Sequence, residues 1–301
     1  MNSVIETTGL THRYGKTAAV DGLNLSVPEG SIYAFLGPNG AGKTTTIKTL
    51  MNILQPTAGS ARILGTDSVK LGPRELTQIG YVSENQQMPE WMTVGQLIAF
   101  CRPMYPNWDE VFCGKLLKEF ELPLDRKLKH LSRGMKMKAA LLTSLAYRPK
   151  LLVLDEPFTG LDPLVREEVI RGMLELTGEG KWTIFISSHD IDEVERLADW
   201  VGVINAGKVE LAESAASLQT RFRRIECVVG ADARLPATLP KSWITPEITT
   251  RSVSVVDSQY EEGVSEKRLK EVFPGADQFS VSEMSLREVF LALARTFRFK
   301  A

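Results

Sequence analysis

The sequence predicts an α/β protein with a parallel central sheet, followed by a smaller α+β unit. Short apolar runs without polar alternation, such as 151–154, are typical of parallel strands that are covered on both faces. Helical segments alternate with these runs, which favours strands joined by crossover helices. The pattern changes near residues 212–220, and 301 residues leave room for a second domain. We therefore expect one domain at 1–215 and another at 216–301.

The N-terminal segments predict two kinds of strand. Residues before about 30 alternate between apolar and polar, with turn residues at 21–22 and 28–30, and this pattern predicts antiparallel strands. The apolar run 31–36 then predicts a buried strand, and the segment 44–54 predicts the helix that follows it.

The middle of the chain becomes helical between about residues 84 and 147, with Pro and Gly interruptions. We expect this stretch to be a helical subdomain inserted into the sheet domain. Buried strands at 151–157 and 182–187 follow. A helix is then expected from Asp190, because the Asp-x-x-Glu spacing to Glu193 is that of a capping box.

The second domain is predicted to be a small α+β appendage. Residues 224–230 and 252–256 have the pattern of strands, and 265–273 and 285–297 that of helices. The last helix begins with a second capping-box pattern, Ser285-x-x-Glu288.

Composition and charge exclude several classes of protein. The chain has 36 Lys and Arg against 37 Asp and Glu, a net charge of -1, with 43% hydrophobic residues. A near-neutral chain lacks the positive charge of nucleic-acid-binding proteins, so no nucleic-acid partner is expected. The three cysteines are widely separated, which fits neither a disulfide framework nor a zinc site and indicates a reducing compartment.

No segment predicts a membrane span. The best apolar stretch, 139–154, is interrupted by Arg148, Pro149 and Lys150 and falls short of about 20 apolar residues. The N-terminus lacks the basic and apolar regions of a secretory signal. We expect a cytoplasmic protein that reaches a membrane only through a partner.

A glycine-rich loop follows the strand at 31–36. Gly37, Gly42, Lys43 and Thr44 match G-x-x-x-x-G-K-[ST] between a predicted strand and a predicted helix. Glycines let backbone N–H groups surround phosphates, and the helix N-terminus favours their negative charge. Lys43 can reach the β- and γ-phosphates, and the Thr44 hydroxyl can bind Mg²⁺. The alternative is an ordinary turn, but a chance match arises only about once in a hundred chains, so we infer a nucleotide site.

Three further polar residues follow predicted parallel strands. Asp155 and Glu156 end the run 151–154, at the edge where open α/β sheets bind ligands. Asp155 is placed to hold Mg²⁺ through its water shell, and Glu156 to accept a proton from an attacking water. His189 follows the next strand and can bond a γ-phosphate or hold the carboxylate. Taken singly, each could be an ordinary surface or packed residue.

Together these motifs resemble those of the ATP-binding subunits of ABC transporters, over about residues 4–210. Residues 37–44 resemble the Walker A motif and 151–157 the Walker B motif. Residues 131–135, LSRGM, resemble the signature loop, and 160–163 the D-loop. The implied fold is a P-loop NTPase ABC cassette, with a parallel core sheet, an antiparallel β subdomain and an inserted helical subdomain, here followed by a small C-terminal α+β domain.

The resemblance assigns roles by position, with ATP and Mg²⁺ as cofactors. His189 becomes the switch histidine, catalytic together with Glu156. Mg²⁺ would be bound by Thr44, Asp155 and Glu84. ATP would be bound by Tyr14, which stacks on adenine, and by Gly37, Pro38, Asn39, Gly40, Ala41, Gly42, Lys43, Thr44 and Thr45. A partner chain would supply its signature loop and D-loop, represented here by Ser132, Arg133, Gly134, Met135 and Asp162.

Two positions depart from the family pattern. Glu84 stands where the family most often has Gln, and it adds a negative charge near the phosphates. Arg133 and Met135 replace the first Gly and the Gln of LSGGQ, whereas the phosphate-facing Ser132 and Gly134 remain.

The resemblance implies a homodimer or heterodimer of ATPase subunits with two ATP molecules between them, working with a separate integral membrane permease on the inner face of the membrane. Pro89, Trp91 and Met92 either receive a helix of that permease or belong to the subdomain core. Residues 282–293 resemble the tails of drug- and antibiotic-exporter ATPases, so we expect an exporter. The alternatives are an importer subunit and an ABC ATPase without a transport role, while a GTPase or kinase would lack LSRGM.

Overall fold

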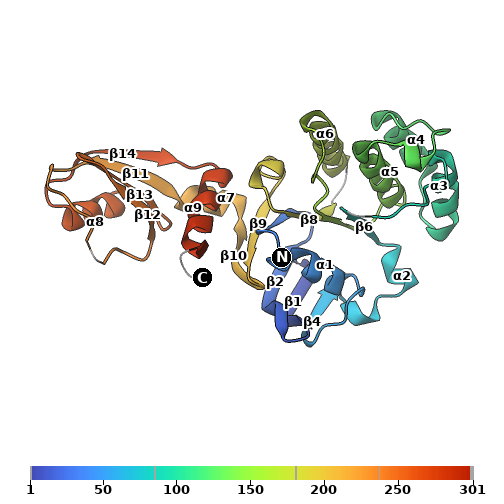
Figure 1. The fold of residues 1–301 in the computed structure, drawn as a ribbon, viewed down its shortest axis with the longest axis horizontal. Helices are drawn as coiled ribbons and strands as arrows, with labels where there is room; N and C mark the ends of the chain where they lie inside the picture. The colour runs from blue at the N-terminus through green and yellow to red at the C-terminus, as the bar shows by residue number, and fades with distance from the viewer. Residues whose placement is uncertain (1, 85, 180–181, 237, 299–301) are drawn as a thin grey trace. The chain divides into compact units, whose positions relative to one another are not determined.

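The computed structural model describes residues 2–84, 86–179, 182–236 and 238–298. By contacts between Cα atoms the chain divides into two compact units, Met1–Ala212 and Glu213–Ala301. Figure 1 shows the ribbon with its elements labelled. Each unit is described in turn.

A largely parallel six-stranded sheet forms the centre of the first unit. All residues of its strands β3, β7 and β8 are buried, which accounts for their uninterrupted apolar sequences. Neighbouring pairs among β3, β6, β7, β8 and β9 are parallel, so their carboxyl ends meet at one edge. The strand order is β10 (Lys208–Ser214), β9 (Trp200–Asn205), β3 (Ile32–Leu36), β8 (Thr183–Ser188), β7 (Leu151–Asp155) and β6 (Ile79–Ser83).

An antiparallel sheet in the order β2-β1-β4-β5 packs with the helix α1 (Lys43–Leu50) and the parallel sheet. Side chains from both sheets and from α1 form one hydrophobic core, including Leu10, Ile47 and Phe185, each fully buried. This core fixes α1, and therefore the loop before it, against the sheet. The strands are β1 (Ser3–Tyr14), β2 (Thr17–Pro28), β4 (Ala58–Ile63) and β5 (Thr66–Asp67).

Helices occupy the region between β6 and β7, and Figure 1 shows α3, α4 and α5 grouped together. Each begins at a residue whose side chain accepts a backbone N–H, and these caps are Thr93, Asp109 and Ser132. The bounds are α3 (Val94–Cys101), α4 (Glu110–Glu119) and α5 (Arg133–Leu145), with α2 (Pro73–Leu76) before β6 and α6 (Pro163–Glu179) after β7.

The helix expected from Asp190 is wrong. Only a single 3₁₀ turn forms, at Ile191–Glu193, and Asp190 caps it by accepting the N–H of Asp192. Glu193 does not return to the cap, because its buried carboxylate accepts the Ser188 hydroxyl at 2.5 Å instead. Its other oxygen lies 3.5 Å from Arg166 of α6, so these two contacts together outweigh the capping pattern.

The second unit is a four-stranded sheet in the order β12-β13-β11-β14, with α8 (Val264–Val272) on its apolar face. Strands β11 (Arg223–Val228) and β13 (Ser252–Asp257) and both predicted helices are present. The Ser285 and Glu288 side chains each accept the other residue's backbone N–H, as the capping box requires. The sequence analysis missed the remaining elements, α7 (Ala215–Arg221), β12 (Trp243–Ile248) and β14 (Asp277–Glu283).

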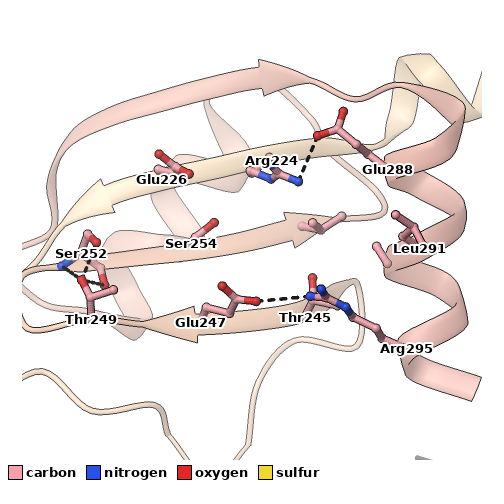
Figure 2. Close-up of a pocket in the computed structure, with 12 residues that line it drawn as sticks. Arg224, Glu226, Thr245, Glu247, Thr249, Ser252, Ser254, Glu288, Leu291 and Arg295 are labelled. Carbon is pink, nitrogen blue, oxygen red and sulfur yellow. Dashed lines mark hydrogen bonds and ion pairs between the residues drawn. The ribbon is translucent and has the colours of Figure 1, made fainter. Parts of the chain in front are cut away.

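The polar face of this second sheet forms a hollow of about 460 Å³ with α9 (Leu286–Arg298). Figure 2 shows Glu288, Leu291 and Arg295 on the side of α9 that faces the strands. Two ion pairs connect the helix to the sheet, Arg224–Glu288 at 3.2 Å and Arg295–Glu247 at 3.4 Å. Two arginines and two glutamates of the hollow therefore pair with one another across it.

Among the described residues, none of the helices is both long enough and apolar enough to traverse a bilayer.

Candidate functional site

The glycine-rich loop at 37–43 follows the carboxyl end of β3 and leads directly into α1. Gly42 has φ 109°, and a Cβ there would lie 2.3 Å from the carbonyl oxygen of Ala19. A Cβ on Gly37 would lie equally close to the carbonyl oxygen of Ile204. Only glycine fits at these two positions. No side chain of the described residues caps the N-terminus of α1, so its first N–H groups remain available to an anion.

The Lys43 side chain is buried within the loop, with 5% of its surface exposed. Its Nζ donates to the carbonyl oxygens of Gly37 at 2.6 Å and Pro38 at 3.2 Å, and lies 3.0 Å from Glu156 Oε1. These contacts hold a positive charge at the point that the loop encloses. The arrangement is suited to a phosphate group.

Asp155, at the end of β7, is connected to α1 and to β8. Its Oδ1 accepts the Thr44 hydroxyl at 3.1 Å and the Ser187 hydroxyl at 2.7 Å. Burial raises the pKa of Asp155, whereas these two hydrogen bonds act in the opposite direction. A hydroxyl and a carboxylate oxygen therefore lie side by side at the edge of the phosphate loop.

Glu156 has a left-handed backbone, with φ 51°, which is unusual for a residue other than glycine. The Ser187 hydroxyl oxygen accepts its N–H at 3.0 Å and so helps to hold this conformation. Its Oε2 accepts the Thr159 hydroxyl at 3.2 Å and lies 2.7 Å from His189 Nδ1. Its Oε1 is buried and lies 3.0 Å from Lys43 Nζ. A bound water could reach that oxygen once a phosphate drew Lys43 away from it.

Opposing effects set the pKa of Glu156. Burial raises it, but the hydrogen bond with His189 and the charge of Lys43 together outweigh burial and lower the pKa. Glu156 is therefore ionised at neutral pH and can only accept hydrogen bonds. It follows that His189 Nδ1 carries the proton in this contact.

Tyr14 lies at the end of β1, and its ring is 54% exposed. The ring makes an edge contact with His12, with 4.7 Å between centroids. The next strand, β2, passes the glycine-rich loop at Ala19. Tyr14 thus offers an exposed aromatic ring on a hairpin that leads to the loop.

The residues of the signature-loop pattern form a second group, at the start of α5. Ser132 is exposed and caps this helix by accepting the Met135 N–H at 3.2 Å. Gly134 is buried against α6, and a Cβ there would lie 2.6 Å from Val165 Cγ1. Asp162 caps α6 by accepting the Val165 N–H at 3.0 Å. The first turns of α5 and α6 are therefore packed together.

Glu84 follows β6, and its backbone N–H donates to the carbonyl oxygen of Asp155 at 2.8 Å. Its carboxylate pairs with Arg133, since Oε1 accepts Nη2 at 3.0 Å. Glu84, which the sequence predicted to bind Mg²⁺, thus contacts Arg133 of the signature loop. These are two of the positions at which the sequence departs from the family pattern.

The structure brings Lys43, Thr44, Asp155, Glu156 and His189 into one hydrogen-bonded set. Ser187 and Thr159 also belong to it, and the sequence analysis missed both. A signal for Ser187 existed, because it lies near the carboxyl end of β8, directly opposite Asp155 in the sheet. Trp91 is 67% exposed and Met92 is buried, so the expected apolar patch contains Trp91 but not Met92.

Comparison with known proteins agrees with this site. A family model described as ABC transporter matches residues 20–159. The bacitracin transport ATP-binding protein BcrA of Bacillus licheniformis is 37% identical over 211 residues, which are 69% of each chain. The daunorubicin/doxorubicin resistance ATP-binding protein DrrA of Streptomyces peucetius is 34% identical over 96% of this chain and 92% of its own. A solved ATP-binding subunit of an ABC transporter, at 27% identity, superposes with a TM-score of 0.66 over 72% of this chain and 92% of its own.

This chain belongs to the ATP-binding subunits of ABC transporters. The predicted family, the predicted fold class and the predicted ATPase activity are confirmed. As an ABC ATPase the protein binds and hydrolyses ATP, and subunits of this family work with separate membrane permease components.

Proposed function

We propose that this ABC ATPase powers the export of a small molecule through a separate permease, with Glu156 as the base that activates water. One observation carries the proposal: Lys43, Glu156 and His189 form a bonded array within contact of Asp155 and Thr44. A phosphate-binding cation, a general base and a carboxylate next to a hydroxyl are the parts that ATP hydrolysis needs.

The loop residues would bind the triphosphate through their backbone N–H groups and Lys43, while the exposed face of Tyr14 stacks on adenine. The glycine-only positions at Gly37 and Gly42 and the uncapped N-terminus of α1 support this binding mode. The other loop residues, Pro38, Asn39, Gly40, Ala41 and Thr45, complete the enclosure.

Thr44 and Asp155 would hold Mg²⁺ together with phosphate oxygens and water. Mg²⁺ is usually bound by one or two carboxylates plus substrate phosphates, so the Thr44 hydroxyl next to Asp155 fits this ion. The described residues contain no group of three or more acidic, histidine or cysteine side chains that could by itself hold a metal ion, and such a group is not required here. When bound, Mg²⁺ offsets the charge that develops on the phosphates.

Glu156 would take the proton of the attacking water at Oε1, the oxygen that contacts Lys43 rather than His189. His189 holds the other oxygen and fixes the direction of the carboxylate. In the chain alone, Lys43 lowers the basicity of Glu156 through their 3.0 Å contact. A γ-phosphate would compete for Lys43, so ATP binding itself would make Glu156 a stronger base.

The proposed base is tested with Glu156→Gln. This variant keeps a similar shape and should bind ATP with affinity close to that of the wild type. Its kcat should fall by about 10²–10⁴-fold, the usual contribution of a general base. Glu210→Gln, an exposed substitution on β10, is the matched control and should retain wild-type turnover. Equal turnover in Glu156→Gln and the wild type would remove Glu156 from the chemistry.

We further propose that two ATPase subunits associate head to tail, so that the signature loop and D-loop of one chain complete the nucleotide site of the other. The exposed Ser132 hydroxyl and the nearby N-terminus of α5 support contact with a partner's γ-phosphate. Arg133, Met135 and Asp162 would line the same face.

A complementation experiment tests this dimer. Lys43→Ala damages the phosphate loop and Ser132→Arg damages the signature loop, so each variant alone should be inactive. A mixed dimer retains one site in which both parts are intact, and mixing should restore part of the activity. If each site were built within one chain, mixing would restore none.

The direction of transport rests on the relative DrrA. DrrA, whose name links it to drug resistance, matches 96% of this chain and therefore also the C-terminal unit. Resistance to a drug follows when the drug leaves the cell.

We place the chain in the cytoplasm, on the inner face of the membrane, with Trp91 exposed for contact with the permease. Co-purification from gently solubilised membranes should recover a polytopic membrane protein, and recovery with a solute-binding protein would instead indicate an importer.

A further inference from the structure

We propose that Arg133 is a positioning residue that neutralises Glu84 beside the nucleotide site, an inference that rests on the proposed function. The two positions depart from the family pattern separately in the sequence, and the structure joins them in one ion pair, with Nη2 of Arg133 3.0 Å from Oε1 of Glu84. The Arg133 guanidinium therefore balances the carboxylate charge that replaces the usual amide.

The guanidinium connects three functional segments. Glu84 is held to the end of β7, because its N–H donates to the carbonyl oxygen of Asp155. The same guanidinium lies against the D-loop, where a Cβ on Gly160 would be 2.6 Å from Arg133 Nη1. Gly160 has φ 69°, which favours glycine, and its missing side chain leaves room for the arginine.

A contribution to folding stability does not explain why an arginine stands at position 133. Arg133 is the first residue of α5, where the helix dipole disfavours a positive charge. The pair is also partly exposed, with 51% of the Arg133 side chain and 31% of the Glu84 side chain accessible. Exposed ion pairs of this kind contribute little to folding stability.

Glu84, in contrast, needs a compensating charge. Ser83, the last residue of β6, lies opposite Asp155 in the parallel sheet. Glu84 is the next residue, so it lies close to the carboxyl end of β7, where Asp155 and Glu156 are. An unpaired Glu84 would repel the triphosphate, and this repulsion would be strongest without Mg²⁺ to offset the phosphate charge. Arg133 removes that repulsion and keeps the carboxylate turned toward α5.

The experiment measures binding of a fluorescent ATP analogue in EDTA, and in parallel the KM for Mg-ATP. Arg133→Gln should weaken Mg²⁺-free binding about tenfold, because Glu84 is left unpaired. The double variant Glu84→Gln/Arg133→Gln should return to within about threefold of wild type, because no charge then needs balancing. Arg133→Lys, which retains the charge, should also stay within about threefold. The effect of Arg133→Gln should shrink in 1 M salt, where the Debye length is about 3 Å.

The matched control is Arg102→Gln, which breaks an ion pair with Glu110 in the same subdomain. Arg102 is as exposed as Arg133, at 51%, and should leave binding unchanged. Rescue by removal of Glu84 distinguishes charge balance from a structural role, because deleting a carboxylate cannot restore lost packing. Wild-type binding in Arg133→Gln, or a defect that persists in the double variant, would overturn the inference. Failure of Lys43→Ala to weaken binding would instead count against the nucleotide site itself.

Discussion

Ser187 offers the sharpest test of how the site is organised, because one hydroxyl bonds both the Asp155 carboxylate and the Glu156 backbone. It donates to Asp155 at 2.7 Å and accepts the Glu156 N–H at 3.0 Å, and it is fully buried. Ser187→Ala removes a hydrogen bond to a charged group and leaves a buried N–H unpaired. Each loss costs about 1–3 kcal/mol, and the two overlap, so we expect the free energy of unfolding to fall by about 2–4 kcal/mol.

The catalytic effect should exceed what the stability loss explains. Without Ser187, the left-handed backbone of Glu156 loses a constraint, and displacement of a catalytic group by about 1 Å can cost 10²-fold in rate. The substitution also removes a hydrogen bond that lowers the pKa of Asp155, so that pKa should rise further. A protonated Asp155 cannot bind Mg²⁺, and the acid limb of the pH–rate profile should therefore move to higher pH.

Ser188→Ala is the matched control for these measurements. Ser188 is equally buried, and its hydroxyl also donates to a carboxylate, Glu193 Oε2, at 2.5 Å. Its loss should lower the free energy of unfolding by a similar amount, measured by urea titration, and change kcat less than about threefold. If the two variants had the same kcat and the same pH profile, the assignment of a specific role to Ser187 would be wrong.

Two further predictions concern packing and pH. Gly134→Ala should lower the free energy of unfolding by about 1–3 kcal/mol, because its Cβ would meet Val165 at 2.6 Å. Val165→Ala should relieve this defect. The control is Gly114→Ala, which has open space around it and should stabilise α4 by about 0.5–1 kcal/mol. In the C-terminal unit, hydrogen bonds from Arg221 lower the pKa of Glu213 despite its partial burial. The folded state therefore binds the proton less readily than the unfolded one, so the stability from this pair is present above the ordinary pKa of glutamate and is lost as pH falls through the lowered value. Glu213→Gln should lower the melting temperature at pH 7 but not near pH 2, and Glu247→Gln, which breaks an exposed pair, should have little effect at either pH.

The nucleotide-binding unit could be predicted from the sequence because its local patterns and its tertiary structure agree. The strand β7 carries no polar alternation and is buried throughout, and the loop before α1 contains glycines where a Cβ would clash. Where another contact competes with a local pattern, the prediction fails. At Asp190 the Glu193 carboxylate contacts Ser188 and Arg166 instead of returning to the cap.

The strands β12 and β14 were missed for another physical reason. Strand β12 contains Pro246 and has a register shift between Ile244 and Glu247, so it does not alternate regularly. Strand β14 is an edge strand that is almost wholly exposed and therefore lacks an apolar face. Ser187 was not assigned, and the pairing of Arg133 with Glu84 was not foreseen, because these contacts join residues that are distant in the sequence.

Lys43 connects nucleotide binding with the chemistry in this site. In the chain alone its Nζ is shared between the loop carbonyls and Glu156. One ammonium group offers three donors, and a γ-phosphate would compete with the carboxylate for them. Removal of this cation from Glu156 would raise the pKa of the base, because the charge of Lys43 is among the effects that lower it. The contact between Lys43 and Glu156 thus makes Glu156 a weaker base until ATP binds, and bound ATP would displace it. Water would therefore be activated only when the site holds ATP.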